Sequence, residues 1–370
     1  MHSTAIDRRS FLALAAGAAL VPFGAAAAGR PIWLAANADA ARQFAFGAFD
    51  GTGARVFEID LPGRGHGVTI SPDGRHAALV ARRPGTFAVI VDLAVGRAVR
   101  WLETPPDRHH HGHGMFSGDG NLFFTGENDF ANGRGVIGVW DARDGFRRLG
   151  EYPSHGIEPH DLRMMPDGRT LVVANGGIRT HPDSGRARLN LDDMDSSLVY
   201  MDARDGGLLA RFQLVPDLRL QSMRHLSVTR DGVVAIGLQY QGDEDRVEPV
   251  FGLHRGGEAI RLLAMPDAVA GTVRNYCGSI ALDASGRIAA ASCPRGGLIS
   301  FWDVDGGRFL GVSRLADGCG VAAGPDVGSM VATSGRGGAM LWVDGTETAL
   351  DGGYLASRRW DNHAAVASLP

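Results

Sequence analysis

The chain has 370 residues, of which 44% are hydrophobic, so it can bury one large core or two ordinary ones. Its formal net charge is −4 without a basic tail or patch, which argues against a nucleic-acid partner. Glycine is frequent, with 53 residues, and glycine-rich turns between short apolar runs favour an all-β protein. Three cysteines are too few for a disulfide scaffold.

The N-terminal segment has the pattern of an export signal. Arg8 and Arg9 precede Phe-Leu and the apolar run 13–23, and small residues then offer a cleavage site. This pattern predicts a twin-arginine signal over residues 1–28 and a periplasmic mature protein, with an uncleaved anchor or an ordinary Sec signal as alternatives. The run is too short to cross a bilayer, and no other stretch is apolar for long enough. We therefore expect no membrane span in the mature chain.

A repeated pattern runs along the rest of the chain: a His or Cys, a short apolar strand, a Pro/Asp/Gly turn and a second apolar strand. The leading residues are His66, His113, His160, His225, Cys277, Cys319 and His363. They are separated by 47, 47, 65, 52, 42 and 44 residues. A period in the forties is typical of four-stranded propeller blades. Seven leading residues therefore predict an all-β fold, a seven-bladed β-propeller.

The remaining strands predict how the ring closes. The strands expected in the unit that starts at His113 are 114–117, 121–126, 135–140 and 146–150. His363 leaves room for only one strand, and the three that complete its blade are expected at 32–36, 43–48 and 54–59. This one-plus-three join of the termini would remove free sheet edges within a single domain over residues 30–370. The alternative is an open sandwich or two smaller β domains.

The leading residues are the candidate metal ligands. The first strand of each propeller blade lines the axis, so the seven would form a ring near one end of the channel. Most are followed by Gly or Ala, as crowding at the axis requires. Side chains that only line a water-filled channel are the alternative, but Ser, Thr or Asn would serve there equally well. Imidazole and thiolate bind transition metals, and this set suits copper or zinc, with iron also possible.

Other residues are candidates to orient the ring or to line the channel mouth. The carboxylates expected to hold imidazoles are Asp107, Glu158, Asp161 and Asp361. The residues expected where second strands return to the same end are Asn128, Asn175, Ser334 and Cys293. The run His109, His110 and His111 either adds ligands or forms a mobile, solvated approach. Cys293 is expected across a hairpin from Cys277, where a disulfide and metal ligation by Cys277 are both open.

The loops at this end are long and acidic. Loop 176–196 carries His181, Asp192, Asp193 and Asp195, and loop 240–249 carries Asp243, Glu244, Asp245 and Glu248. Together with Glu127 and Asp129 they predict a negative rim, which would concentrate cations. Solvated loops without a role are the alternative.

Two resemblances rest on these residues. From the Arg8-Arg9 signal to His363, the chain resembles a family of exported bacterial proteins of unassigned function. The motifs are His66-Gly, His111-Gly-His113-Gly and Glu158-Pro-His160-Asp161. That family is often associated with periplasmic iron-uptake gene clusters that include imelysin-like proteins, which implies an uptake protein as a partner.

The second resemblance is local. The Glu158-Pro-His160-Asp161 motif and the His110-His111-Gly-His113 cluster are similar to motifs of the copper-cluster propeller of nitrous oxide reductase, where inner-strand histidines hold copper. It implies a metal site at the axis. Two leading residues here are Cys and no cupredoxin-type domain follows, so nitrous oxide reduction is not expected.

Three hypotheses of function remain. The first is a periplasmic metal-binding propeller that accepts, holds or passes on copper or iron. The second is a redox enzyme that uses this metal, and the third is a metal-free interaction scaffold. No nucleophile elbow, phosphate-binding loop, dinucleotide fingerprint or c-type haem motif is present in the sequence.

Overall fold

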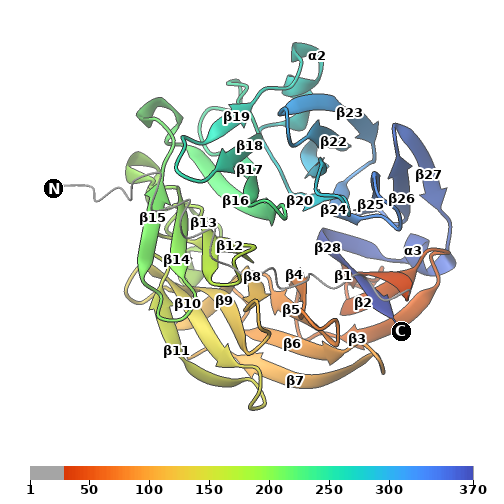
Figure 1. The fold of residues 1–370 in the computed structure, drawn as a ribbon, viewed down its shortest axis with the longest axis horizontal. Helices are drawn as coiled ribbons and strands as arrows, with labels where there is room; N and C mark the ends of the chain where they lie inside the picture. The colour runs from red at the N-terminus through yellow and green to blue at the C-terminus, as the bar shows by residue number, and fades with distance from the viewer. Residues whose placement is uncertain (1–28, 370) are drawn as a thin grey trace.

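The computed structural model describes residues 29–369, and the predicted signal over residues 1–28 lies outside this range. The described chain forms seven four-stranded antiparallel sheets arranged as blades around a central axis (Figure 1). The predicted seven-bladed β-propeller is therefore confirmed. Among the described residues, no helix combines the length and the apolar character that crossing a membrane requires.

One blade contains strands from both ends of the chain. From the axis outward its strands are β28 (Arg359–Leu369), β1 (Arg30–Ala38), β2 (Phe44–Asp50) and β3 (Arg55–Asp60). Strands β28 and β1 pair antiparallel, with Arg30 opposite Leu369. This is the expected one-plus-three join, in which the N-terminal and C-terminal strands of the described chain pair with each other.

Each of the other blades uses four consecutive strands, from the axis outward. The first three of these blades are β4 (Gly65–Ile70), β5 (His76–Ala81), β6 (Phe87–Asp92) and β7 (Arg97–Glu103); β8 (Arg108–Phe116), β9 (Leu122–Asp129), β10 (Arg134–Asp141) and β11 (Arg147–Pro153); and β12 (Pro159–Met164), β13 (Thr170–Asn175), β14 (Ser197–Asp202) and β15 (Leu208–Phe212).

The last three are β16 (Gln221–Val228), β17 (Val233–Tyr240), β18 (Phe251–Arg255) and β19 (Arg261–Leu263); β20 (Ser279–Leu282), β21 (Ile288–Cys293), β22 (Leu298–Asp303) and β23 (Arg308–Arg314); and β24 (Gly318–Ala323), β25 (Ser329–Ser334), β26 (Ala339–Val343) and β27 (Thr346–Leu350). The short helices of the connections are η1 (Pro182–Ser184), η2 (Leu191–Asp193), η3 (Pro216–Leu218), α2 (Asp267–Ala270), η4 (Gly271–Val273), η5 (Pro294–Gly296) and α3 (Gly353–Ser357).

The repeated Asp-Gly turns have a local cause. The Ser71 hydroxyl donates to Asp73 at 2.6 Å, and Gly74 adopts φ +70°, which favours glycine. The Ser117 hydroxyl makes the same bond to Asp119 at 2.6 Å. Each turn joins the innermost strand of its blade to the second strand, and so fixes where the innermost strand ends.

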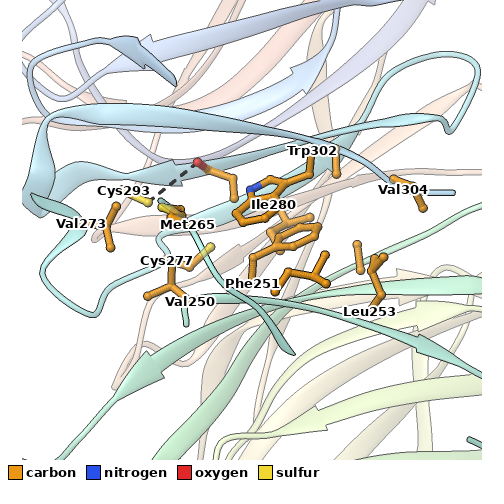
Figure 2. Packing of buried hydrophobic residues seen from close by; sticks show 14 of the residues in the cluster. Val250, Phe251, Leu253, Met265, Val273, Cys277, Ile280, Cys293, Trp302 and Val304 are labelled. Atoms are coloured by element: carbon orange, nitrogen blue, oxygen red, sulfur yellow. Dashed lines mark hydrogen bonds between the residues drawn. The ribbon is translucent and has the colours of Figure 1, made fainter. Parts of the chain in front are cut away.

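The apolar core lies between the faces of adjacent blades. Trp302 of β22 stacks on Phe251 of the preceding blade, with ring centroids 4.8 Å apart and planes inclined by 7° (Figure 2). On the other side of the same blade, Phe301 of β22 stacks on Trp342 of β26 in the following blade, with ring centroids 4.0 Å apart. This packing holds the blades side by side and brings their innermost strands into contact around the axis.

Candidate metal centre at the propeller axis

Five of the seven leading residues meet at the axis, and we call them the imidazole cluster: His66, His113, His160, His225 and His363. They come from the innermost strands of five blades, β4, β8, β12, β16 and β28. Ring centroids lie as close as 4.3 Å for His113 and His363, and 5.0 Å for His160 and His225. Two groups of three, His66–His113–His160 and His113–His225–His363, have potential ligand atoms within 4.8 Å of one another. The two groups share His113.

Irregularities in the innermost strands accompany these side chains. The register with the second strand shifts between Gly65 and Val68, around His66, and between His110 and Gly114, around His113. Strands β12, β16, β24 and β28 show a shift at or beside their own leading residue. A β-bulge re-aims a side chain, so these shifts explain how the histidines leave the regular alternation of a strand.

Glycine beside the histidines is required by close approach. A Cβ atom on Gly112 would lie 2.4 Å from Cδ2 of His66, and Gly112 has φ +122°. A Cβ atom on Gly67 would lie 2.7 Å from Nδ1 of His113. The His-Gly pattern of the sequence therefore reflects the contact between β4 and β8 at the axis.

Two aspartates contact the Nδ1 atoms of imidazoles in the cluster. Nδ1 of His66 lies 2.9 Å from Oδ1 of Asp361, and Nδ1 of His113 lies 3.3 Å from Oδ1 of Asp161. Burial opposes ionisation of Asp361, but its hydrogen bond to His66 and the charge of Arg64 keep the pKa of its carboxyl low. A carboxylate that accepts from Nδ1–H leaves Nε2 as the metal-binding atom.

Several ring nitrogens of the cluster have no hydrogen-bond partner among the described residues. They are Nε2 of His113, Nε2 of His363 and both nitrogens of His225, and all are buried. An unsatisfied buried polar group costs about 1–3 kcal/mol. A bound metal ion would give these nitrogens the partner they lack, so the residues fit a metal of the kind imidazole binds.

Burial also keeps these imidazoles uncharged. It lowers the pKa of all five histidines, and the positive charge that neighbouring imidazoles would carry lowers it further for His113, His225 and His363. Metal binding needs the neutral ring because the lone pair must be free. The cluster is therefore in the protonation state for ligation at neutral pH.

The cysteines of the predicted ring do not join the imidazoles. Neither Cys277 nor Cys319 belongs to the two groups, and Sγ of Cys319 lies 3.7 Å from Oδ1 of Asp317. Cys277 packs in the apolar cluster with Cys293, as Figure 2 shows, and all three cysteines are free thiols. Burial raises the pKa of Cys277 to about 12. Among the described residues, the two groups of potential ligands therefore offer imidazole nitrogen alone.

The Glu158-Pro-His160-Asp161 motif acts partly through an arginine. Glu158 does not touch an imidazole: its Oε1 accepts from Nη1 of Arg224 at 2.5 Å, and that same Nη1 lies 3.3 Å from Nδ1 of His160. Glu158 has φ +61°, an uncommon value for a residue with a side chain. Arg224 was not among the sequence candidates, although it directly precedes the leading residue His225.

The other supporting candidates lie away from the cluster. Asp107 pairs with Arg108, Asn128 donates to Nε2 of His109 at 3.0 Å, and Asn175 donates to the Ser154 carbonyl at 3.0 Å. Ser334 donates to the Ala316 carbonyl at 2.7 Å. None of these contacts involves a histidine of the imidazole cluster.

The expectation of a mobile, solvated histidine run is wrong. His109, His110 and His111 belong to β8 and are 3%, 0% and 2% exposed. His109 and His110 pair with the last three residues of β9, which the sequence prediction missed. Only His111 reaches the channel mouth, and neither of its ring nitrogens has a partner among the described residues.

The predicted negative rim is also wrong. A cavity of about 940 Å³, the mouth cavity, opens above the cluster and reaches His66, His160 and His225. Seven arginines line it and only two carboxylates, those of Glu244 and Asp245. The arginines are Arg82, Arg83, Arg186, Arg188, Arg224, Arg274 and Arg295.

The other acids of the predicted rim are neutralised or lie elsewhere. Glu127 pairs with Arg148, Asp129 with Arg108 and Arg134, Asp195 with Arg211, and Glu248 with Arg246. The loops 176–196 and 240–249 do face the mouth, but through Arg186, Arg188, Glu244 and Asp245.

Comparison with solved structures supports the fold. The chain matches Kuenenia stuttgartiensis hydrazine synthase with a TM-score of 0.62 and 14% identity, over 84% of this chain and 90% of that one. It matches a chain of the mitotic checkpoint complex with a TM-score of 0.54 and 14% identity, over 77% and 75%. It matches the propeller domain of Cps50 (Swd1) from Myceliophteria thermophila with a TM-score of 0.55 and 14% identity, over 83% of this chain and 93% of that one. At this identity the likeness shows the fold alone.

Comparison of the sequence identifies one family. The model of a family described as "Protein of unknown function (DUF1513)" matches residues 59–367. No curated protein gives a significant match. The resemblance to a family of unassigned function is therefore supported, and its description assigns no chemistry to the axis.

Proposed function

The chain belongs to this family of proteins of unknown function (DUF1513), and we propose that it is a periplasmic metal-binding propeller that accepts, holds or passes on copper or iron at the imidazole cluster. One observation carries the proposal. Buried ring nitrogens of His113, His225 and His363 have no hydrogen-bond partner in the described part of the chain, and these residues have potential ligand atoms within 4.8 Å of one another at the axis. Without a ligand, burial of these polar atoms would cost free energy that no hydrogen bond or metal bond offsets.

The donor atoms favour copper over iron. Both three-residue groups offer nitrogen alone, from neutral imidazoles. Divalent copper binds such sites more tightly than the other first-row metals, whereas non-haem iron commonly takes a carboxylate beside two histidines. Asp161 and Asp361 bind imidazoles from behind, which makes them positioning residues rather than ligands.

The periplasmic location rests on the sequence. Arg8 and Arg9 with the apolar run behind them are the pattern of a twin-arginine signal. This pathway exports folded proteins, so a metal could enter before or after export. A periplasmic metal-uptake protein is the partner that we propose.

A second candidate function is a metal-dependent oxidoreductase. The mouth cavity reaches His66, His160 and His225, so a metal held there would face space large enough for a small substrate. Turnover of a reductant by the metal-loaded protein would separate this function from binding alone.

The experiment is metal analysis by mass spectrometry on natively exported protein, purified without chelator. We expect stoichiometric copper or iron in the wild type and its loss in His113→Ala, because His113 belongs to both groups. His225→Gln keeps the side-chain size and leaves only one group intact, so it should retain less metal. His254→Gln removes a buried imidazole outside the cluster and should keep the full content.

The result that would overturn the proposal is a metal-free wild type that remains empty after challenge with copper and with iron. Circular dichroism of each variant shows whether it is folded. An empty, folded wild type would leave the metal-free scaffold as the function.

A further inference from the structure

The mouth cavity gathers more positive than negative charge, and most of its arginines form no ion pair in the described part of the chain. Of its seven arginines, only Arg224 has a carboxylate partner within ion-pair distance among the described residues. The whole chain has a net charge of −4, so this concentration of arginine is local. Elsewhere the buried arginine Arg108 is matched by Asp107, Asp129 and Glu151.

Two guanidinium nitrogens of the mouth cavity are buried and unsatisfied. Nη1 of Arg83 and Nε of Arg224 are buried without a hydrogen-bond partner among the described residues. Burial lowers the pKa of Arg82 and of Arg83, and neighbouring arginines lower it further. Placing like charges together in a half-buried wall is unfavourable unless an anion completes the site.

The outer arginines approach from separate connections. Arg186 and Arg188 come from the loop between β13 and β14, Arg274 from the segment before β20 and Arg295 from the turn between β21 and β22. Nη1 of Arg188 donates to the Gln241 carbonyl at 3.0 Å, and Arg295 lies over the Tyr276 ring at 4.3 Å. These contacts fix both side chains at the mouth while leaving other N–H groups free to donate.

We propose that the mouth cavity binds a small molecule carrying two or more oxyanion groups, carboxylates or phosphates. The guanidinium fork matches both groups with paired hydrogen bonds. Several forks converge from different sides, and about 940 Å³ is far more space than one inorganic ion fills, so the ligand is an extended molecule. The proposal does not depend on a metal at the cluster. If the proposed function holds, this ligand lies directly above the metal.

The test is isothermal titration calorimetry on the metal-free mature protein at low ionic strength, with citrate and with inorganic pyrophosphate as separate probes. We expect saturable one-site binding of at least one probe. Binding of citrate alone assigns a polycarboxylate, and binding of pyrophosphate alone assigns a phosphate ligand. The Arg83→Met/Arg186→Ala variant should bind at least tenfold more weakly, whereas Arg100→Ala, which removes an exposed arginine of outer strand β7, should bind as the wild type does.

A second readout separates a binding role from a structural one. Arg83→Met removes an unpaired buried charge, so the anion-free variant should melt at the same temperature as the wild type or higher. The wild type should gain thermal stability from the probe that binds, and the Arg83→Met/Arg186→Ala variant should gain less at the same probe concentration. Absence of saturable binding of both probes, or equal binding by the double variant, would overturn the proposal. Because metal is absent throughout, this outcome is independent of the metal analysis.

Discussion

Nδ1 of His66 lies 2.9 Å from Oδ1 of Asp361, and the two residues come from opposite ends of the described chain. His66 is on β4, the innermost strand of the first complete blade, whereas Asp361 is on β28, which completes the closing blade. The carboxylate accepts the Nδ1 proton and directs Nε2 away from itself. The join of the termini therefore also sets the orientation of a candidate ligand.

Asp361→Asn should weaken metal binding about 10- to 100-fold while leaving the fold intact. The amide keeps the shape of the carboxylate but loses the negative charge that makes the imidazole a better donor. Copper affinity can be measured by competition with a chelator of known affinity. Asp73→Asn, which changes a turn aspartate of the blade that carries His66, serves as the control. Unchanged affinity in Asp361→Asn would show that the carboxylate does not position His66.

Gly112→Ala should destabilise the protein by about 2–5 kcal/mol, since it combines an overpacked contact with an unfavourable backbone angle. The new Cβ would lie 2.4 Å from Cδ2 of His66, at φ +122°. Urea unfolding of the metal-free protein measures the change. Gly257→Ala shares a positive φ, +78°, but meets no atom within 4 Å, so its loss isolates the backbone cost. Equal losses in the two variants would mean that the axis tolerates the methyl group.

The ring of blades could be predicted because its signal is periodic in the sequence. The first six leading residues each precede an apolar strand and a turn with Asp and Gly, and the incomplete unit at His363 identifies the closing blade. The register within a strand could not be predicted, because a bulge depends on contacts between blades. Cys277 illustrates this: its N–H bonds to the Leu238 carbonyl of the preceding blade, and β20 begins only at Ser279. Cys277 therefore occupies the leading position of its repeat in the sequence, yet its side chain packs in the apolar core instead of at the axis.

The sign of the charge at the mouth could not be predicted from loop composition. Glu127 and Asp129 lie on β9 and are wholly buried against arginines from other strands. Arg82 and Arg83 follow β5 directly, at the same end of the blade, and neither forms an ion pair among the described residues. Burial lowers the pKa of both, and the carboxylates that act in the opposite direction, those of Asp361 and Glu158, are bound to other side chains. Net charge along a segment does not report which charges find a partner in three dimensions. The ion pairs of the folded protein show that the charged side chains left without a partner at the mouth are mostly arginines.

Thiol titration will decide between the disulfide and the free cysteines. Cys277, Cys293 and Cys319 are 0%, 0% and 4% exposed, and none is bonded to another. Natively exported protein should therefore react with Ellman's reagent at none of them when folded, and at all three in guanidinium without reductant. Burial also raises the pKa of these thiols, which slows their reaction further. One reactive thiol after unfolding would instead reveal a disulfide, for which Cys277 and Cys293 are the expected pair.

Acid should destabilise the protein partly through His254, a buried histidine outside the cluster. Its Nδ1 lies 2.6 Å from the Tyr200 hydroxyl and its Nε2 3.0 Å from the Glu258 carbonyl, so the neutral ring satisfies both partners. Burial lowers the pKa of His254 from 6.5 to about 4. Between these values the unfolded chain holds a proton that the folded chain does not. Stability from this group is therefore complete above about pH 6.5 and falls as the pH drops toward 4, by about 1.4 kcal/mol per unit.

His254→Gln isolates this contribution, because the other buried histidines titrate alike in both proteins. Urea unfolding at pH 7 and at about pH 5.5 gives the loss of stability for each. We expect the wild type to lose about 1 kcal/mol more than the variant over this interval. Parallel losses would mean that His254 titrates in the folded protein as it does in the unfolded chain, and its burial would then carry no pH dependence.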